Sequence, residues 1–75
     1  MSSYILDLHG YRHHEVDVVV ENFIYLNQDE MPLTIICGNS EKMLSLVRVV
    51  LERANAEYYN GSGHEYGQIK VYRLN

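Results

Sequence analysis

The hydrophobic period of this chain changes along its length, and this change most constrains the fold. Residues 3–9 have the pattern of a strand, which ends at Gly10. From about His14 the apolar residues follow the i, i+3, i+4 spacing of a helix, with a polar face opposite. A polar loop over residues 27–32 follows this helix and precedes a second strand-to-helix step.

The second half of the chain repeats the step and then adds two strands. Leu33–Cys37 is a short apolar strand, consistent with a position flanked on both of its edges. The next helix is capped by Asn39 or Ser40 and ends near Asn55. The last two strands are expected at residues 57–59 and 67–74, joined by a turn at residues 60–63.

This order of elements is β-α-β-α-β-β. Two right-handed crossover connections place both helices on one face of a four-stranded sheet. We therefore expect the α/β fold class, as a two-layer βαβαββ sandwich with a mixed sheet. Residues 1–75 are expected to form one domain, near the lower size at which a core holds a fold without disulfides or metals.

Composition narrows the kind of protein further. The chain is 47% hydrophobic and 21% charged, as a globular domain is. Cys37 is the single cysteine, which excludes an internal disulfide and suits a reducing compartment. No apolar run approaches the ~20 residues that span a bilayer, and no signal peptide begins the chain. We expect a small soluble cytoplasmic protein with no membrane partner.

The net charge of −4 weighs against tight nonspecific binding to nucleic acid, which depends on cations that neutralise phosphates. Six Lys and Arg residues stand against ten Asp and Glu residues. The net charge does not exclude a local basic patch, which would be formed by Arg12, Lys42, Lys70 and Arg73.

Asp7 and His9 give the most direct indication of chemistry. Residues two apart in a strand share a face, so the two side chains are expected side by side where the strand ends before Gly10. A neutral histidine accepts a proton near pH 7, and a neighbouring carboxylate fixes its tautomer. We predict that Asp7 orients His9, which acts as acid or base. The alternative is that both residues only occupy the solvent side of a sheet edge.

The turn Gly38-Asn39-Ser40 opens the second helix, where backbone N–H groups favour an anion such as phosphate. Lys42 adds positive charge in the first helical turn. The ends of the first two strands are expected to lie together, because ligands collect at the carboxyl ends of parallel strands. An ordinary capped turn is the alternative. The predicted substrate-binding residues are Gly10, Arg12, Gly38, Asn39, Ser40 and Lys42.

Neither a metal site nor a cofactor is expected. The spacing of His13, His14 and His64 fits no closed zinc pattern, and Cys37 alone cannot complete one. The chain is rich in tyrosine, with seven residues. Those in or near loops either stack on nucleic-acid bases or pack at the edge of a small core: Tyr11, Tyr58, Tyr59 and Tyr66.

The run Leu6–Gly10, followed by Glu15-Val16 at the start of a helix, resembles the beginning of the Smr (small MutS-related) domain. That family has a small residue or histidine, a glycine, any residue and a second glycine between its second strand and second helix. This chain has Cys37-Gly38-Asn39-Ser40 there, with a serine in place of the second glycine. The similarity extends over essentially the whole chain, in the same order and spacing.

The resemblance implies a βαβαββ sandwich with nucleic-acid nicking or RNA endonuclease activity. It also implies that Asp7 and His9 are the catalytic pair and that Gly38 and its neighbours contact phosphate. The implied partners are nucleic acid, either RNA or DNA, and the ribosome. Two alternatives stay open: a module that binds nucleic acid or a ribosomal surface without cutting, and a protein-interaction domain whose acidity suits a basic partner. The oligomeric state is open as well.

Overall fold

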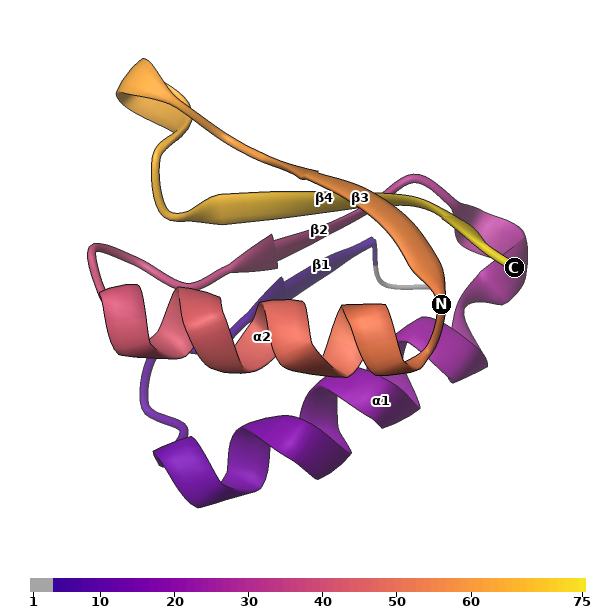
Figure 1. Cartoon of the computed structure of the whole chain (residues 1–75), viewed down its shortest axis with the longest axis horizontal. Helices are drawn as coiled ribbons and strands as arrows, with labels where there is room; N and C mark the ends of the chain where they lie inside the picture. Colours follow the sequence, from indigo (N-terminus) through magenta and orange to yellow (C-terminus); the bar gives the residue numbers. More distant parts are fainter. Residues whose placement is uncertain (1–3) are drawn as a thin grey trace.

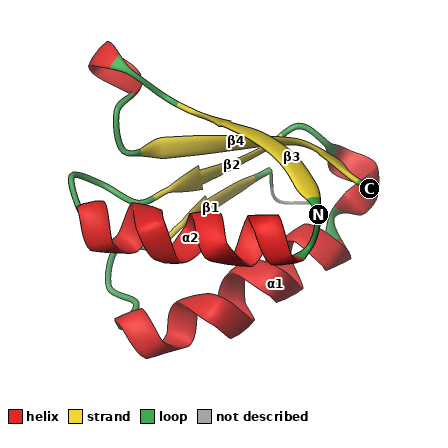
Figure 2. Ribbon diagram, viewed as in Figure 1, coloured by secondary structure: helices red, strands yellow, loops and turns green. Residues whose placement is uncertain are grey.

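The structure is a computed structural model that describes residues 4–75, and it has the predicted two-layer architecture. Two α-helices pack on one face of a four-stranded mixed sheet (Figures 1 and 2). Neither helix in this range is long and apolar enough to cross a membrane. The elements are β1 (Ile5–Asp7), α1 (Val16–Leu26), β2 (Leu33–Ile36), α2 (Glu41–Arg53), β3 (Ala56–Asn60) and β4 (Gln68–Leu74).

The first strand is shorter than predicted. β1 pairs with β2 only as far as Asp7, and the predicted start at residue 3 lies outside the described residues. The carboxylate of Asp7 accepts the backbone N–H of His9, which turns the chain out of the sheet at this point. His9 therefore belongs to the loop after the strand and not to the strand itself.

Three short 3-10 turns fall where the sequence predicts loops or a helix start. Figure 2 shows them as the short red segments next to the main helices and at the tip of the β3–β4 hairpin. The first one replaces the predicted start of the first helix, because the Glu15 N–H donates to the Arg12 carbonyl at 2.9 Å and closes a 3-10 turn. The three turns are η1 (His13–Glu15), η2 (Gln28–Glu30) and η3 (Gly63–Glu65).

The strand order in the sheet is β1-β2-β4-β3. β1 and β2 are parallel, and β4 runs antiparallel to both of its neighbours. The last strand thus returns between β2 and β3, which leaves β1 and β3 as the edges. β2 is flanked on both sides, as its apolar composition predicts.

The core lies between the sheet and the two helices. In β2, Leu33 and Ile35 are buried toward the helices, while Thr34 and Ile36 lie half-exposed on the other face. Fully burying such a side chain contributes about 1.5–3 kcal/mol. The helices close the layer with the apolar stripes that the sequence predicts. Their buried residues are Val16, Val20, Phe23, Ile24, Met43, Leu44, Val47, Val50 and Leu51.

The ends of α2 have clear chemical causes. Ser40 caps the helix, because its hydroxyl oxygen accepts the backbone N–H of Met43 at 3.1 Å. Of the two predicted caps, Ser40 is therefore the one used. Asn55 follows the last turn with φ of 62°, a left-handed conformation that asparagine tolerates and that stops a helix. β3 starts at the next residue.

Candidate active site at the carboxyl ends of β1 and β2

The parallel pairing of β1 and β2 places the loops after the two strands together. The pairing ends with Asp7 opposite Ile36, and the Leu8 N–H still donates to the Ile36 carbonyl at 2.9 Å. Beyond this point the chain leaves the sheet at His9 in one loop and at Gly38 in the other. The sequence-based expectation that these two ends lie side by side is met.

Asp7 and His9 form a hydrogen-bonded pair. The Nδ1 of His9 lies 2.6 Å from the Oδ1 of Asp7, and the backbone N–H of His9 donates to the same oxygen at 2.9 Å. Because a carboxylate only accepts, Nδ1 carries the proton of the neutral ring and Nε2 keeps its lone pair. The His9 side chain is 65% exposed, so the pair is open to solvent.

The two hydrogen bonds keep the Asp7 carboxylate ionised. The backbone N–H of His9, and then its imidazole, lower the pKa of Asp7 below the ordinary value of 3.8. The carboxylate is therefore negative throughout the neutral range. A fixed negative charge next to Nδ1 holds the tautomer in which Nε2 carries the lone pair.

Gly38 lies directly against the imidazole of His9. A Cβ on Gly38 would lie 2.8 Å from the Nε2 of His9, so a side chain here collides with the ring. Gly38 also has φ of +73°, a left-handed conformation that favours glycine. The glycine of the second loop thus makes room for the imidazole that the first loop provides.

Gly67 holds the second loop in place, a role that no sequence pattern predicts. Its carbonyl accepts the backbone N–H groups of Cys37 at 2.7 Å and of Gly38 at 3.2 Å. A Cβ on Gly67 would lie 2.6 Å from the Gly38 carbonyl oxygen. The two glycines are far apart in the sequence and meet only through the pairing of β2 with β4, so local spacing carries no signal of this contact.

The other predicted substrate-binding residues around the two loops have separate local roles. Gly10 has φ of +91°, and a Cβ there would meet no atom within 4 Å, so its backbone conformation alone requires glycine. Asn39 is exposed next to Gly38, and the hydroxyl of Ser40 is used by the helix cap. The Gly38 amide donates to Gly67, and the exposed residues that follow it are Asn39, Glu41 and Lys42.

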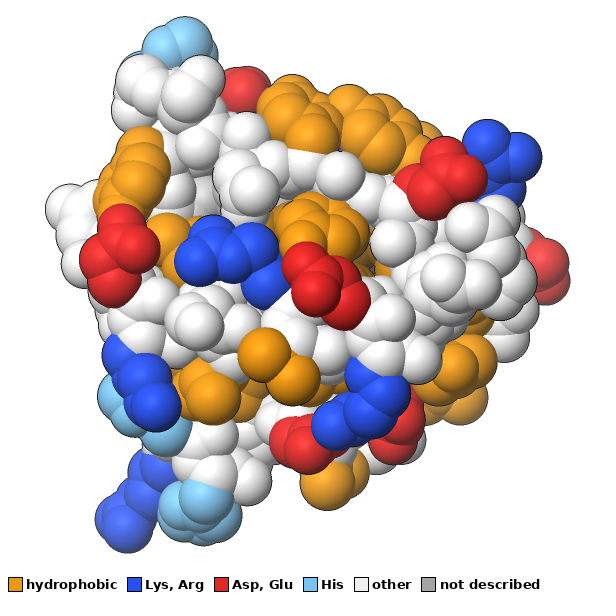
Figure 3. Space-filling view, viewed as in Figure 1, with side chains coloured by type: hydrophobic (Ala, Val, Ile, Leu, Met, Phe, Trp, Pro, Cys, Tyr) orange, Lys and Arg blue, Asp and Glu red, His pale blue; other side chains and the backbone are white. Residues whose placement is uncertain are grey.

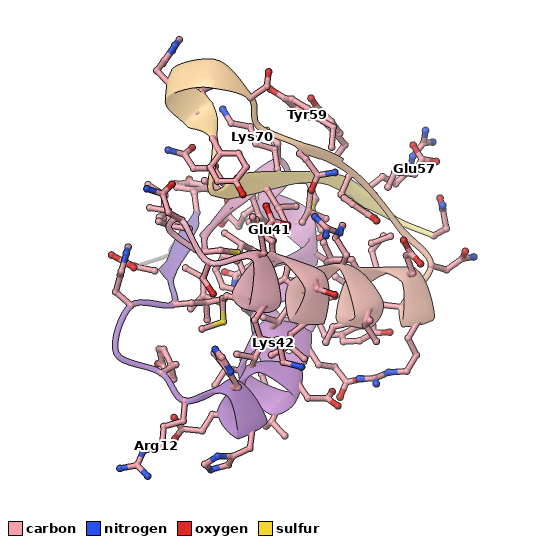
Figure 4. All side chains as sticks on the ribbon, turned by 60° about the vertical axis from the view of Figure 1, so that its left-hand side comes forward. Arg12, Glu41, Lys42, Glu57, Tyr59 and Lys70 are labelled. Carbon is pink, nitrogen blue, oxygen red and sulfur yellow. The ribbon has the colours of Figure 1, made fainter. Side chains whose placement is uncertain are left out.

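The basic residues do not gather into one patch. Figure 4 shows Arg12 pointing away from the molecule at the start of α1, while Lys70 lies at the opposite end of the view. Lys42 is exposed in the first turn of α2, next to the acidic Glu41. Arg73 forms an ion pair with Glu57 at 3.1 Å. Of the expected cations, Lys42 is thus the one that belongs to the helix start beside Gly38.

Glu41 and Cys37 complete the surroundings of the loop. The Tyr66 hydroxyl donates to the Glu41 carboxylate, which ties the segment before β4 to the start of α2. Cys37 is buried below the loop, and burial raises the pKa of its thiol to about 11. The thiol therefore stays protonated near neutral pH and packs as a small apolar group.

Within residues 4–75, no three His, Cys, Asp or Glu side chains converge on a common metal position. The same residues enclose no pocket. Comparison with known protein families, with characterised proteins and with solved structures finds no match to this chain.

Proposed function

We propose that this chain is a small Smr-like nuclease that cleaves RNA or nicks a nucleic-acid strand, with His9 as acid and base and Asp7 as its orienting partner. The observation that supports this proposal best is the 2.6 Å contact between Asp7 and the Nδ1 of His9, with Nε2 next to Gly38. The similarity of Leu6–Gly10 to the first Smr motif points to the same pair.

With RNA as the substrate, the proton transfers need no protein side chains other than those of Asp7 and His9. Nε2 of His9 takes the proton of a 2′-hydroxyl, and the 2′-oxygen attacks the adjacent phosphorus. The bond to the 5′-oxygen breaks, and this oxygen receives a proton from the imidazolium or from water. The products are a 2′,3′-cyclic phosphate and a 5′-hydroxyl.

The second loop provides the phosphate contacts in this proposal. The amides at the start of α2 carry the partial positive charge of a helix N-terminus, and Lys42 adds a full charge in the first turn. A phosphate held there lies beside the Nε2 of His9, because Gly38 has no side chain to separate the two. Glu41 in the same turn opposes an anion, so binding at this position is expected to be weak and salt-sensitive.

The test is cleavage of end-labelled single-stranded RNA and of supercoiled DNA, each with and without EDTA. We compare the wild-type chain with His9→Ala, and use His13→Ala as the matched control, since His13 is an exposed histidine in η1. We expect RNA cleavage that persists in EDTA, ends in a cyclic phosphate and is lost only in His9→Ala. Loss of one general base lowers the rate by about 10²–10⁴-fold.

Three results contradict the proposal. Wild-type protein that is folded but cuts neither substrate removes the nuclease assignment. Equal cleavage by wild type and His9→Ala points to a contaminating nuclease. A plain 3′-hydroxyl product that depends on a metal ion excludes the 2′-hydroxyl route. Nicking of DNA without RNA cleavage would keep the nuclease assignment and replace the 2′-hydroxyl with water as nucleophile.

A further inference from the structure

The sheet has an uncovered face opposite the two helices. Both helices lie on one side of the sheet (Figure 1), and alternate residues of each strand point to the other side. One row of paired positions on this open face runs Ile5, Thr34, Lys70 and Tyr59, from β1 to β3. A second row contains Asp7, Ile36 and Gln68. The proposed active-site carboxylate thus lies on the open face itself.

Two tyrosines form an aromatic surface at the β3 side of this face. The rings of Tyr59 and Tyr72 stack with their centroids 5.5 Å apart and an interplanar angle of 13°. They are 41% and 50% exposed, so ring surface remains open to solvent. Figure 3 shows a group of hydrophobic side chains along β3 at the upper edge of the molecule. Each exposed ring offers a π-face on which a nucleic-acid base can stack.

One cation of the sheet, Lys70, lies beside the tyrosine rings. Of the two carboxylates that the strands carry, Glu57 forms an ion pair with Arg73, and Asp7 lies on β1 at the other edge of the sheet, hydrogen-bonded to His9. Lys70 is directly opposite Tyr59 in the β3–β4 register, and Figure 4 shows both projecting on the same side, with Glu57 at the far end of the strand. No ion pair involves Lys70 in the described part of the chain.

Tyr72 adds no negative charge near neutral pH. Partial burial, and then the neighbouring Tyr59, raise the pKa of the Tyr72 hydroxyl above 10.0, with a smaller contribution from Glu65. Glu65 is the acid of the β3–β4 turn that acts on this face. Aromatic rings next to the Lys70 ammonium suit a ligand that combines flat bases with phosphates.

We propose that the open face of the sheet binds single-stranded nucleic acid, with bases stacked on Tyr59 and Tyr72 and a phosphate held by Lys70. The inference rests on the proposed function in one respect: the strand would continue across the sheet to the Asp7–His9 pair. The path from β3 to β1 crosses three strand spacings, about 14 Å at about 4.8 Å each. A strand of a few nucleotides covers this length.

The test measures binding without cleavage. The probes are fluorescein-labelled ten-nucleotide oligothymidine and 2′-O-methyl oligouridine, which lack the attacking hydroxyl, and a duplex of the same sequence. Fluorescence anisotropy compares the wild-type chain with Tyr59→Leu and Tyr72→Leu. Tyr25→Leu is the matched control, because Tyr25 is 45% exposed on α1, away from the open face. Circular dichroism shows that each variant is folded.

We expect each of the two sheet substitutions to weaken single-strand binding about tenfold, as loss of one stacked base does. The control should bind as wild type does, and the duplex should bind more weakly. Lys70→Gln provides a second readout that does not disturb the aromatic pair. It should reduce the slope of log K against log salt concentration by about 0.7, the value for one phosphate contact on a single strand.

The outcomes separate this inference from the nuclease proposal. Unchanged affinity in both tyrosine variants, or no binding of any probe, overturns the proposal that the open face binds single strands, even if RNA is cleaved. If binding depends on the two tyrosines but the protein cleaves neither RNA nor DNA, the result supports nucleic-acid binding at the open face and removes the nuclease assignment. A preference for one of the two single-stranded probes identifies whether the ligand is RNA-like or DNA-like.

Discussion

Gly38 has two independent reasons to be glycine, and they can be separated by experiment. Its backbone is left-handed, and the imidazole of His9 occupies the space where a Cβ would lie. The nearest atom belongs to the end of a rotatable side chain and not to the backbone. A methyl group at this position therefore displaces the ring of His9 rather than the loop.

Gly38→Ala is expected to disable the Asp7–His9 pair at a moderate cost in stability. The left-handed backbone costs about 1–2 kcal/mol for alanine. Moving the ring breaks the alignment of His9 with Asp7, so RNA cleavage should fall by tenfold or more. Urea unfolding measures the stability, and the imidazole NMR signals of His9 report its position.

Gly10→Ala is the matched control for this substitution. Gly10 is also left-handed, at φ of +91°, but a Cβ there meets no atom within 4 Å. The two variants should lose similar stability, and only Gly38→Ala should shift the His9 signals. Identical His9 signals in both proteins would show that the ring does not rest on Gly38.

Asp7 makes the stability of the folded chain depend on pH in the acid range. Its pKa is lowered in the folded chain, so the unfolded chain takes up a proton at higher pH than the folded chain does. The stabilising effect of the carboxylate is complete above the ordinary pKa of 3.8 and is lost as the pH falls through the folded value. Asp7→Asn should remove this part of the acid dependence, measured as urea unfolding midpoints across the acid range. A wild-type curve that parallels that of Asp7→Asn would mean that the hydrogen bonds to His9 do not form in solution.

At the scale of elements, the start of α2 depends on one hydroxyl. The Ser40 side chain accepts the Met43 N–H, and this bond satisfies one of the free amides of the first turn. The helix also carries the loop that packs against His9. Its cap therefore affects both the stability of the element and the position of the candidate site.

Ser40→Ala should lower the free energy of unfolding by about 1 kcal/mol. Ser45→Ala serves as control, because Ser45 is exposed in the middle of the same helix and alanine there is the better helix former. Thermal or urea unfolding should therefore show loss in the first variant and a small gain in the second. Equal effects of the two substitutions would contradict the capping role.

Local patterns predict most of the elements because each pattern reflects a local rule. The change of hydrophobic period gives the order of strands and helices, and the side-chain oxygen before Glu41 marks a helix start. The 3-10 turn at His13–Glu15 is not predictable in this way, since the bond from the Arg12 N–H to Glu15 is compatible with an α-helical first turn as well. The early end of β1 is not predictable for a similar reason, because it depends on a single hydrogen bond from the His9 N–H to the Asp7 side chain.

At the scale of the whole molecule, one small core carries the stability. A chain of 75 residues is expected to have a free energy of unfolding of about 4–11 kcal/mol. Ile35 is fully buried at the centre of β2, with a strand on either side. A cavity at this position removes contacts to both layers.

Ile35→Ala should cost about 2–5 kcal/mol, which is a large share of the total. The urea midpoint is expected to fall by about half, or the chain to unfold. Leu26→Ala is the control, because Leu26 is 82% exposed at the end of α1 and its truncation should change stability by less than about 0.5 kcal/mol. A small loss at Ile35 would mean that the core repacks around the missing atoms.

The sequence by itself determined the order of elements, the apolar faces of both helices and the pairing of Asp7 with His9, because these depend on residues close together in the chain. Only the tertiary structure decided that β4 lies between β2 and β3. That insertion brings Gly67 against Gly38 and sets Lys70 and Tyr59 side by side on the open face. Such contacts arise from the packing of segments far apart in sequence, and no local period encodes which strand lies next to which.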